Sequence, residues 1–139
     1  MKRNVWITGA SGGIGSAIAR RFARDSWGVL LQYYHGEQRA QALEEELRAT
    51  GADVMSLSAD VADGEAMQRA AHEAVARFGH IDALVHAAGI ARQQLFTDTT
   101  YEQWSQMLRT HLDGAYWACQ AVLPDMIRRQ SGCIVLVSS

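Results

Sequence analysis

The sequence is poor in proline and cysteine and carries almost no net charge. Its 139 residues include one proline, and 13 basic residues oppose 15 acidic ones for a formal net charge of −2. It has no basic block, which argues against nucleic acid and anionic membrane surfaces as partners. No apolar run is long enough to span a bilayer, and the run after Met1 is too short for a secretory signal.

The two cysteines, Cys119 and Cys133, form no CxxC pair and have no metal-ligand spacing. The sequence therefore predicts neither a metal site nor a disulfide framework. Free thiols without a secretory segment are typical of a cytoplasmic protein, which is the location we expect. Hydrophobic residues make up 48% of the chain and charged residues 20%, a composition that excludes a disordered or collagen-like protein.

What the sequence does contain is an alternation of strand-like and helix-like segments. Apolar, strand-like runs lie at residues 5–7, 29–33, 54–57, 83–85 and 134–137. Amphipathic helical stretches separate them, at residues 14–24, 37–50, 67–78 and 101–129. Strands that are apolar throughout and joined by helical crossovers are typical of a parallel sheet with helices on both faces. We predict one α/β domain over residues 1–139 with a doubly wound parallel sheet.

Side-chain spacing within the helices predicts which faces are buried. The first helix should bury Ile14, Ile18 and Phe22. The last helix has a longer apolar face, made of Trp104, Leu108, Leu112, Ala115, Cys119 and Val122. Because proline lacks an amide hydrogen, Pro124 should kink or restart that helix.

The last predicted strand is apolar and β-branched, and two residues follow it. An apolar strand at an open sheet edge is prone to pairing with other chains. We therefore expect a sheet that is incomplete at its C-terminal edge, in a chain that ends early.

A glycine-rich segment, Thr8-Gly9-Ala10-Ser11-Gly12-Gly13-Ile14-Gly15, lies between the first strand and the first helix. Glycine lets the backbone approach a phosphate closely, and a helix N-terminus offers free amides and a favourable dipole. The strand before and the helix after supply the context that such a motif needs. The alternative is a tight turn without a ligand. The candidate contacts are Gly9, Ser11, Gly12, Gly13, Ile14 and Gly15.

Residues 8–15 resemble the TGxxxGxG element of the short-chain dehydrogenase/reductase family. The resemblance extends to Asp60-Val61, to Ala88-Gly89, and to residues 120–124 and 137–139. It is closest to the 3-oxoacyl-(acyl-carrier-protein) reductase type. The resemblance implies a Rossmann-like sheet with strand order 3-2-1-4-5. It also implies an NAD(P)-dependent oxidoreductase of alcohols and ketones, commonly a homodimer or homotetramer.

The resemblance assigns further cofactor contacts. Asp60 is implied to bind the adenine amino group with Val61 beside the ring, although an Asx-turn or N-cap role also suits this position. Ala88 and Gly89 are implied to pass close to the nicotinamide ribose. The segment Tyr34-His35 has no acid before Glu37, and NAD-specific folds place an acid near here. We therefore expect NADP(H) rather than NAD, although reductases of this type often carry an arginine at the position of Gly12.

The catalytic residues are implied only in part. Ser139 aligns with the serine that orients the substrate carbonyl, and His111 aligns with the catalytic asparagine, with a core histidine as the alternative. His86 and Ala87 replace the usual asparagines, and His86 should be a hydrogen-bonded structural histidine. The family's proton donor is a tyrosine in a YxxxK element, but the only lysine here is Lys2. We expect the 139-residue chain alone to be inactive.

The predicted function is NADPH-dependent reduction of a ketone, with this chain as the cofactor-binding part. A carrier-bound 3-oxoacyl group, as in fatty acid biosynthesis, is one substrate. The aminopentanone group on modified elongation factor P is a second candidate substrate. The reductase of that group is similar to this sequence and can carry histidine at the position of the catalytic asparagine. A non-catalytic NAD(P)-binding or redox-sensing module is the alternative from another class. A receiver or flavodoxin-like domain is disfavoured, since the first strand ends in Thr8-Gly9 without a carboxylate cluster.

Overall fold

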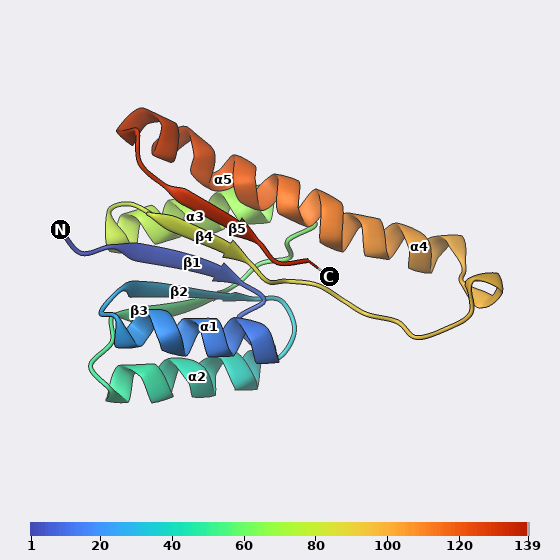
Figure 1. Cartoon of the computed structure of the whole chain (residues 1–139), viewed down its shortest axis with the longest axis horizontal. Helices are drawn as coiled ribbons and strands as arrows, with labels where there is room; N and C mark the ends of the chain where they lie inside the picture. Colours follow the sequence, from blue (N-terminus) through green and yellow to red (C-terminus); the bar gives the residue numbers. More distant parts are fainter. Residues whose placement is uncertain (139) are drawn as a thin grey trace.

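Five parallel strands form a single sheet in the order β3-β2-β1-β4-β5 (Figure 1). The computed structural model describes residues 1–138, and Ser139 lies outside them. The strands are β1 (Asn4–Thr8), β2 (Gly28–Tyr33), β3 (Val54–Ser58), β4 (Ala83–His86) and β5 (Cys133–Leu136). The order confirms the predicted doubly wound, Rossmann-like sheet.

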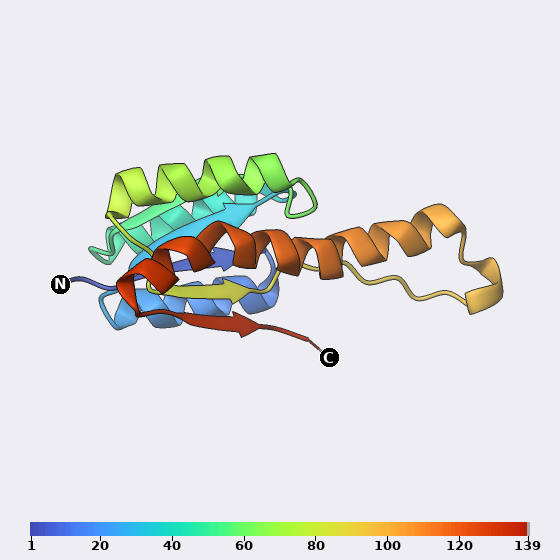
Figure 2. The same ribbon diagram turned by 90° about the horizontal axis from the view of Figure 1, so that it is seen from above.

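Helices cover both faces of this sheet. They are α1 (Gly13–Arg24), α2 (Glu37–Ala49), α3 (Gly64–Phe78), α4 (Tyr101–Leu108) and α5 (Gly114–Arg129). Helices α1 and α2 lie on one face and α3 and α5 on the other (Figure 2). A 3-10 turn, η1 (Phe96–Asp98), precedes α4, and a π-helical turn, η2 (Arg109–Asp113), joins α4 to α5.

The strand β1 shows why the predicted strands are apolar along their whole length. Val5 and Ile7 pack against α1 and α2, whereas Trp6 packs with the α3 and α5 side chains. All three are fully buried. Successive side chains of a strand point to opposite faces, so a strand covered by helices on both faces has no polar side.

The helix α3 begins and ends on local signals that are present in the sequence. The Asp63 carboxylate accepts hydrogen bonds from the amides of Glu65 and Ala66, at 3.0 and 3.1 Å. Gly79 ends the helix with a φ of +85°. The inward residues Met67 and Ala74 are fully buried, as predicted.

Replacing Asp63 with alanine is expected to lower the free energy of unfolding by about 1 kcal/mol, because two first-turn amides lose their acceptor. Urea unfolding of both proteins measures the difference. Glu65→Ala is the matched control, since the exposed Glu65 carboxylate caps no amide, and its loss should be roughly 0.3 kcal/mol. Equal losses in the two variants would contradict the capping role.

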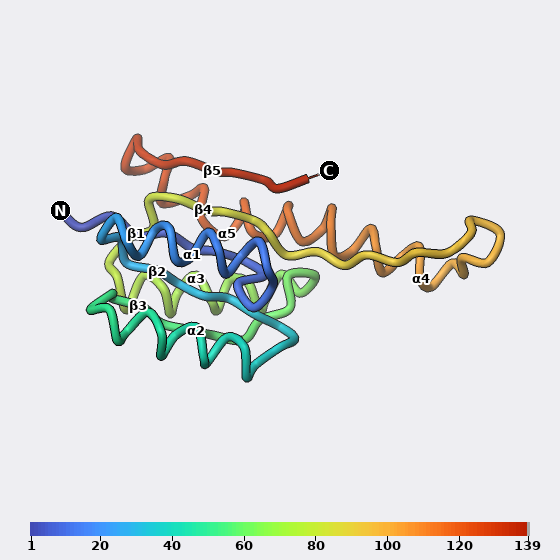
Figure 3. Tube along the Cα trace, turned by 60° about the horizontal axis from the view of Figure 1, so that its bottom comes forward, coloured from blue at the N-terminus to red at the C-terminus, as the bar shows by residue number. Residues whose placement is uncertain are grey.

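Two predictions about the helix faces hold only in part. Ile18 and Phe22 of α1 pack against the core, and Val122 of α5 is buried, as predicted. The buried residues of α5 are Gly114, Ala118, Val122 and Met126, and Leu112 on the predicted face is 64% exposed. The long helical unit projects beyond the sheet at its α4 end, so there is no sheet beneath that part (Figures 1 and 3). Ile14 is likewise exposed, because the buried side of α1 is formed by Gly15 and Ala19.

The helix does not restart at Pro124, where a kink or restart was predicted. Helix α5 runs without interruption through Pro124 to Arg129, and the helical irregularity is η2, the element directly before α5. A π-helical turn adds a residue to one turn of helix, and such turns often occur at functional sites.

The strand β5 pairs with β4 along one edge. Val135 and Leu136 are about half exposed. Within residues 1–138, no helix is both long enough and apolar enough to cross a membrane.

Candidate functional site

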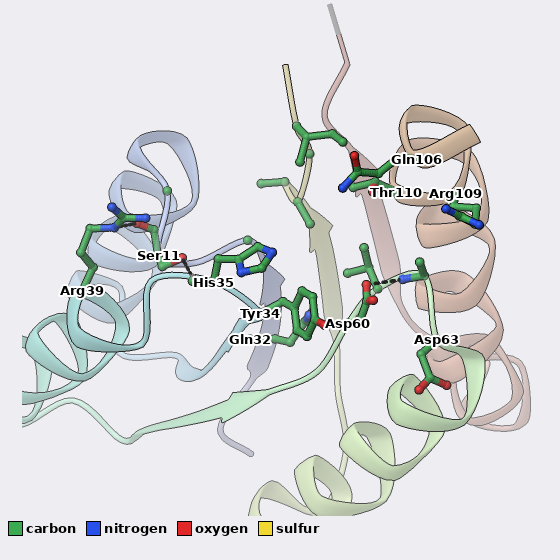
Figure 4. Close-up of a pocket in the computed structure, with 18 residues that line it drawn as sticks. Ser11, Gln32, Tyr34, His35, Arg39, Asp60, Asp63, Gln106, Arg109 and Thr110 are labelled. Atoms are coloured by element: carbon green, nitrogen blue, oxygen red, sulfur yellow. Dashed lines mark hydrogen bonds between the residues drawn. The ribbon is translucent and has the colours of Figure 1, made fainter. Parts of the chain in front are cut away.

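A cavity of about 730 Å³ lies at the carboxyl ends of the strands (Figure 4). The loops after β1, β2, β3 and β4 line it, together with the end of α4 and the start of η2. This edge is where open α/β sheets bind their ligands. The predicted residues that line the cavity are Gly9, Ser11, Gly12, Tyr34, His35, Asp60, Val61, Ala88 and Gly89.

The glycine loop lies tightly against the loop that follows β4. Gly9 has a φ of +66°, and a Cβ atom on it would lie 2.6 Å from the Ala88 Cα atom. A Cβ atom on Gly15 would lie 2.2 Å from the Gly9 carbonyl oxygen. Gly9 and Gly15 are therefore required for packing, and Gly15 does not line the cavity.

The N-terminus of α1 is open at the cavity. Its N-cap residue, Gly12, makes no side-chain capping bond, and a Cβ atom on Gly13 would meet no atom within 4 Å. The amides of Gly13, Ile14 and Gly15 have no acceptor within the helix. Three free amides at a helix N-terminus fit a phosphate group. The side chain of Ile14 points to solvent and, like Gly13, it is not among the cavity-lining residues.

The loop after β2 is tied to the glycine loop by hydrogen bonds. The Ser11 hydroxyl donates to the His35 carbonyl oxygen at 2.8 Å, and the Arg39 Nε group donates to the Ser11 carbonyl oxygen at 3.2 Å. The rings of Tyr34 and His35 pack at a centroid distance of 4.6 Å. No carboxylate from this loop lines the cavity.

Asp60 and Gln32 provide oxygen atoms near the end of β3. The Asp60 carboxylate accepts a hydrogen bond from the Ala62 amide at 3.0 Å, which is the predicted Asx turn, and Asp60 also lines the cavity. Gln32 donates through Nε2 to the Ala59 carbonyl oxygen at 2.6 Å. Its Oε1 atom is buried and has no partner within residues 1–138.

His86 is a structural histidine, as predicted. Its Nδ1 atom lies 2.8 Å from the Thr8 hydroxyl oxygen, which also accepts from the Ala87 and Ala88 amides at 3.1 Å each. Because those amides occupy both lone pairs of the oxygen, the Thr8 hydroxyl donates to Nδ1 and the hydrogen of the neutral ring is on Nε2. Burial, and next the charge of His111, lowers the pKa of His86 from 6.5 to about 4.

His111 lies in η2, and its side chain is exposed, so the reading of a core histidine is wrong. Its Nε2 atom lies 2.7 Å from the Ile90 carbonyl oxygen and 3.2 Å from the Ile90 amide nitrogen. A Cβ atom on Gly89 would lie 2.6 Å from the His111 ring. The histidine therefore packs on the loop after β4, although it does not itself line the cavity.

Residues 3–139 match the family model described as short chain dehydrogenase. The chain belongs to the short-chain dehydrogenase family. It is 35% identical over its whole length to the 3-oxoacyl-(acyl-carrier-protein) reductase of Staphylococcus aureus (strain Mu50), and it covers 56% of that protein. It is 36% identical to the sepiapterin reductase of Chlorobaculum tepidum, with all of this chain and 59% of that protein covered.

A solved short-chain dehydrogenase structure agrees with this assignment. The crystal structure of a 3-ketoacyl-ACP reductase from Sinorhizobium meliloti 1021 superposes with a TM-score of 0.90 at 31% identity, covering 97% of this chain and 53% of that one. The chain thus spans little more than half the length of the relatives it matches. Family membership implies an NAD(P)-type cofactor without distinguishing the two nucleotides.

Three of the residues that line the cavity belong to no motif that the sequence predicts. Gln106, Arg109 and Thr110 line the cavity from the end of α4 and from η2. They belong to no glycine-rich or acidic motif, and only the crossing of this helix over the loop after β4 brings them to the site. Ser139 lies outside the described residues. Within those residues, no cluster of histidine, cysteine, aspartate or glutamate could hold a metal ion.

Proposed function

We propose that the chain binds NADP(H) in the cavity at the carboxyl edge of the sheet and forms the cofactor-binding part of a ketone reductase. The observation that carries this proposal is the open, uncapped N-terminus of α1 at one wall of that cavity. Three free amides and the positive end of the helix dipole suit a pyrophosphate. Gly9, Ser11, Gly12, Gly13, Ile14 and Gly15 are the proposed residues of this phosphate site.

The rest of the nucleotide is assigned to the neighbouring loops. We propose that Asp60 and Val61 receive the adenine, that Tyr34 and His35 lie at its ribose, and that Ala88 and Gly89 lie beside the nicotinamide ribose. The order of these loops along the sheet supports the assignment, since β3, β2, β1 and β4 are consecutive neighbours. When bound, the nicotinamide would supply the hydride.

The preference for NADP(H) over NAD rests on charge. The loop after β2 places Tyr34 and His35 at the cavity, and no carboxylate of that loop lines it. A carboxylate there would hold a 2′-hydroxyl and repel a 2′-phosphate.

For catalysis we propose Ser139 and His111. Ser139 would hydrogen-bond the substrate carbonyl oxygen. His111 holds the backbone of Ile90 at 2.7 Å, which favours a role in keeping the loop after β4 in place. A proton donor from a YxxxK element is not among the 139 residues, so the isolated chain should bind nucleotide without reducing ketones.

A carrier-bound 3-oxoacyl group is the proposed substrate, supported by the Staphylococcus aureus relative. The aminopentanone group on modified elongation factor P is the second candidate, and His111 at the asparagine position favours it.

A cytoplasmic homo-oligomer, a dimer or tetramer, is the proposed assembly. A non-catalytic redox-sensing module is the alternative, and reading the gene past codon 139 distinguishes it, since a downstream YxxxK element supports the reductase.

The purified chain is expected to bind NADPH with one site per chain in a calorimetric titration. In the same preparation, absorbance at 340 nm should show no NADPH oxidation with a 3-oxoacyl thioester, because the proton donor is absent. Failure to bind NADPH would contradict the proposed site. Sustained turnover would instead show that another residue supplies the proton.

A further inference from the structure

Gln32, the second-last residue of β2, is a buried polar side chain that lines the cavity. We infer that Gln32 is a base-recognition residue. It accepts a hydrogen bond from an exocyclic amino group of the bound nucleotide, and so selects adenine over a base with a carbonyl group in the same place. This inference rests on the proposed nucleotide site, and it adds a second acceptor to the one that Asp60 supplies there.

The orientation of the Gln32 amide is fixed by a hydrogen bond to the neighbouring strand. Its Nε2 group donates to the Ala59 carbonyl oxygen at 2.6 Å. With the amide turned over, two oxygen atoms would face each other, so Nε2 lies toward Ala59 and Oε1 does not. Ala59 follows β3 directly and precedes Asp60. The same bond therefore also holds the segment that carries Asp60.

The Oε1 atom of Gln32 is left as an acceptor without a donor. Gln32 is 1% exposed, and Oε1 has no hydrogen-bond partner within residues 1–138. A buried acceptor without a donor costs free energy, and nearly all such atoms in folded proteins have a partner. Gln32 lines the cavity on the side where Figure 4 shows Tyr34 and Asp60. A ligand in the cavity can therefore supply the missing donor.

The protein core does not supply that donor. Trp6 Nε1 and His86 Nε2 are two buried nitrogen atoms on the same face of the sheet, and they too have no partner among the described residues. Neither of them is thus within hydrogen-bond distance of Gln32 Oε1. A buried water molecule is the alternative partner. Water on Oε1 would give the cavity no preference between bases.

Asp60 provides a second free acceptor at the same end of the cavity. Its Oδ1 atom accepts from the Ala62 amide at 3.0 Å, and its Oδ2 atom makes no hydrogen bond within residues 1–138. The 6-amino group of adenine has two hydrogen atoms to donate, whereas guanine and hypoxanthine have an acceptor oxygen there. Two acceptor oxygens match the amino group and repel the carbonyl group, because a site built for a donor leaves its own groups unpaired with the wrong base.

The test compares binding of NADPH and of its hypoxanthine analogue by calorimetry. The wild-type chain should bind NADPH at least tenfold more tightly than the analogue. Gln32→Met keeps the length of the side chain and removes its acceptor, so this preference for adenine should fall by about fivefold or more. Gln41→Met is the matched control, since Gln41 is exposed on α2 and does not line the cavity. It should change neither affinity.

The outcomes separate this inference from the proposed function. Equal binding of the two nucleotides by the wild type, or an unchanged preference in Gln32→Met, would overturn the role of Gln32 and leave the nucleotide site standing. Wild-type protein that binds neither nucleotide would overturn both. Thermal melts check the fold of each variant. If Gln32→Met does not fold, Gln32→Asn takes its place, because its shorter amide stays polar and should lower the preference in the same way.

Discussion

Gly13→Val is expected to abolish NADPH binding and to leave the fold intact. A Cβ atom on Gly13 meets no protein atom within 4 Å, so the added side chain should disturb no packing. Gly13 is the first residue of α1, so the added side chain would stand beside the free amides to which the phosphates are proposed to bind. Loss of phosphate contacts to several amides should weaken binding on the order of a hundredfold or more. A calorimetric titration with NADPH measures the loss.

Ala17→Val is the matched control for this substitution. Ala17 is exposed on α1 and does not line the cavity, so the same β-branched side chain at that position should leave NADPH affinity unchanged. Circular dichroism should show both variants folded. Unchanged affinity in a folded Gly13→Val protein would remove the α1 N-terminus as the phosphate site.

The stability of the chain is expected to rise by about 3 kcal/mol between pH 4 and pH 6.5 because of His86. The folded protein holds the pKa of His86 at about 4, against 6.5 in the unfolded chain. Between these values the unfolded state binds a proton that the folded state does not, so stability falls as the pH is lowered through this window. Each unit of pKa difference corresponds to roughly 1.4 kcal/mol.

His86→Asn should remove this pH dependence, and urea unfolding at pH 4.5 and pH 7 measures the difference between the two proteins. Asparagine is the residue that the family usually has at this position, and it has no charge to gain. His72→Asn is the matched control. His72 is exposed on α3, so its removal should leave the pH dependence of the unfolding free energy unchanged. Parallel pH profiles for wild type and His86→Asn would show that the buried ring does not set the acid stability.

Much of the site was predictable because it consists of short motifs at strand ends. The glycine segment, Asp60-Val61 and Ala88-Gly89 each follow a strand directly, and the carboxyl ends of parallel strands meet at one edge of the sheet. The structure brings residues of all three to the same cavity.

Other features could not be predicted because they depend on contacts between distant parts of the chain. The Thr8 hydroxyl reaches the His86 ring across 78 positions of sequence. This bond exists because β1 and β4 pair with Thr8 opposite His86. The exposure of Leu112 and Ile14 has a similar cause, since periodicity shows that a face is apolar and does not show whether another element covers it.

The sequence by itself determined the alternation of strands and helices, the single parallel sheet and the glycine loop before the first helix. Those features follow from hydrophobic periodicity and backbone freedom, which act between residues a few positions apart. Only the tertiary structure decided that Arg39 and Arg109 lie at opposite sides of one cavity, that His86 is buried and neutral, and that His111 packs on the backbone of Ile90. These arrangements depend on strand order and on the crossing of helices over loops, which bring together residues far apart in the chain.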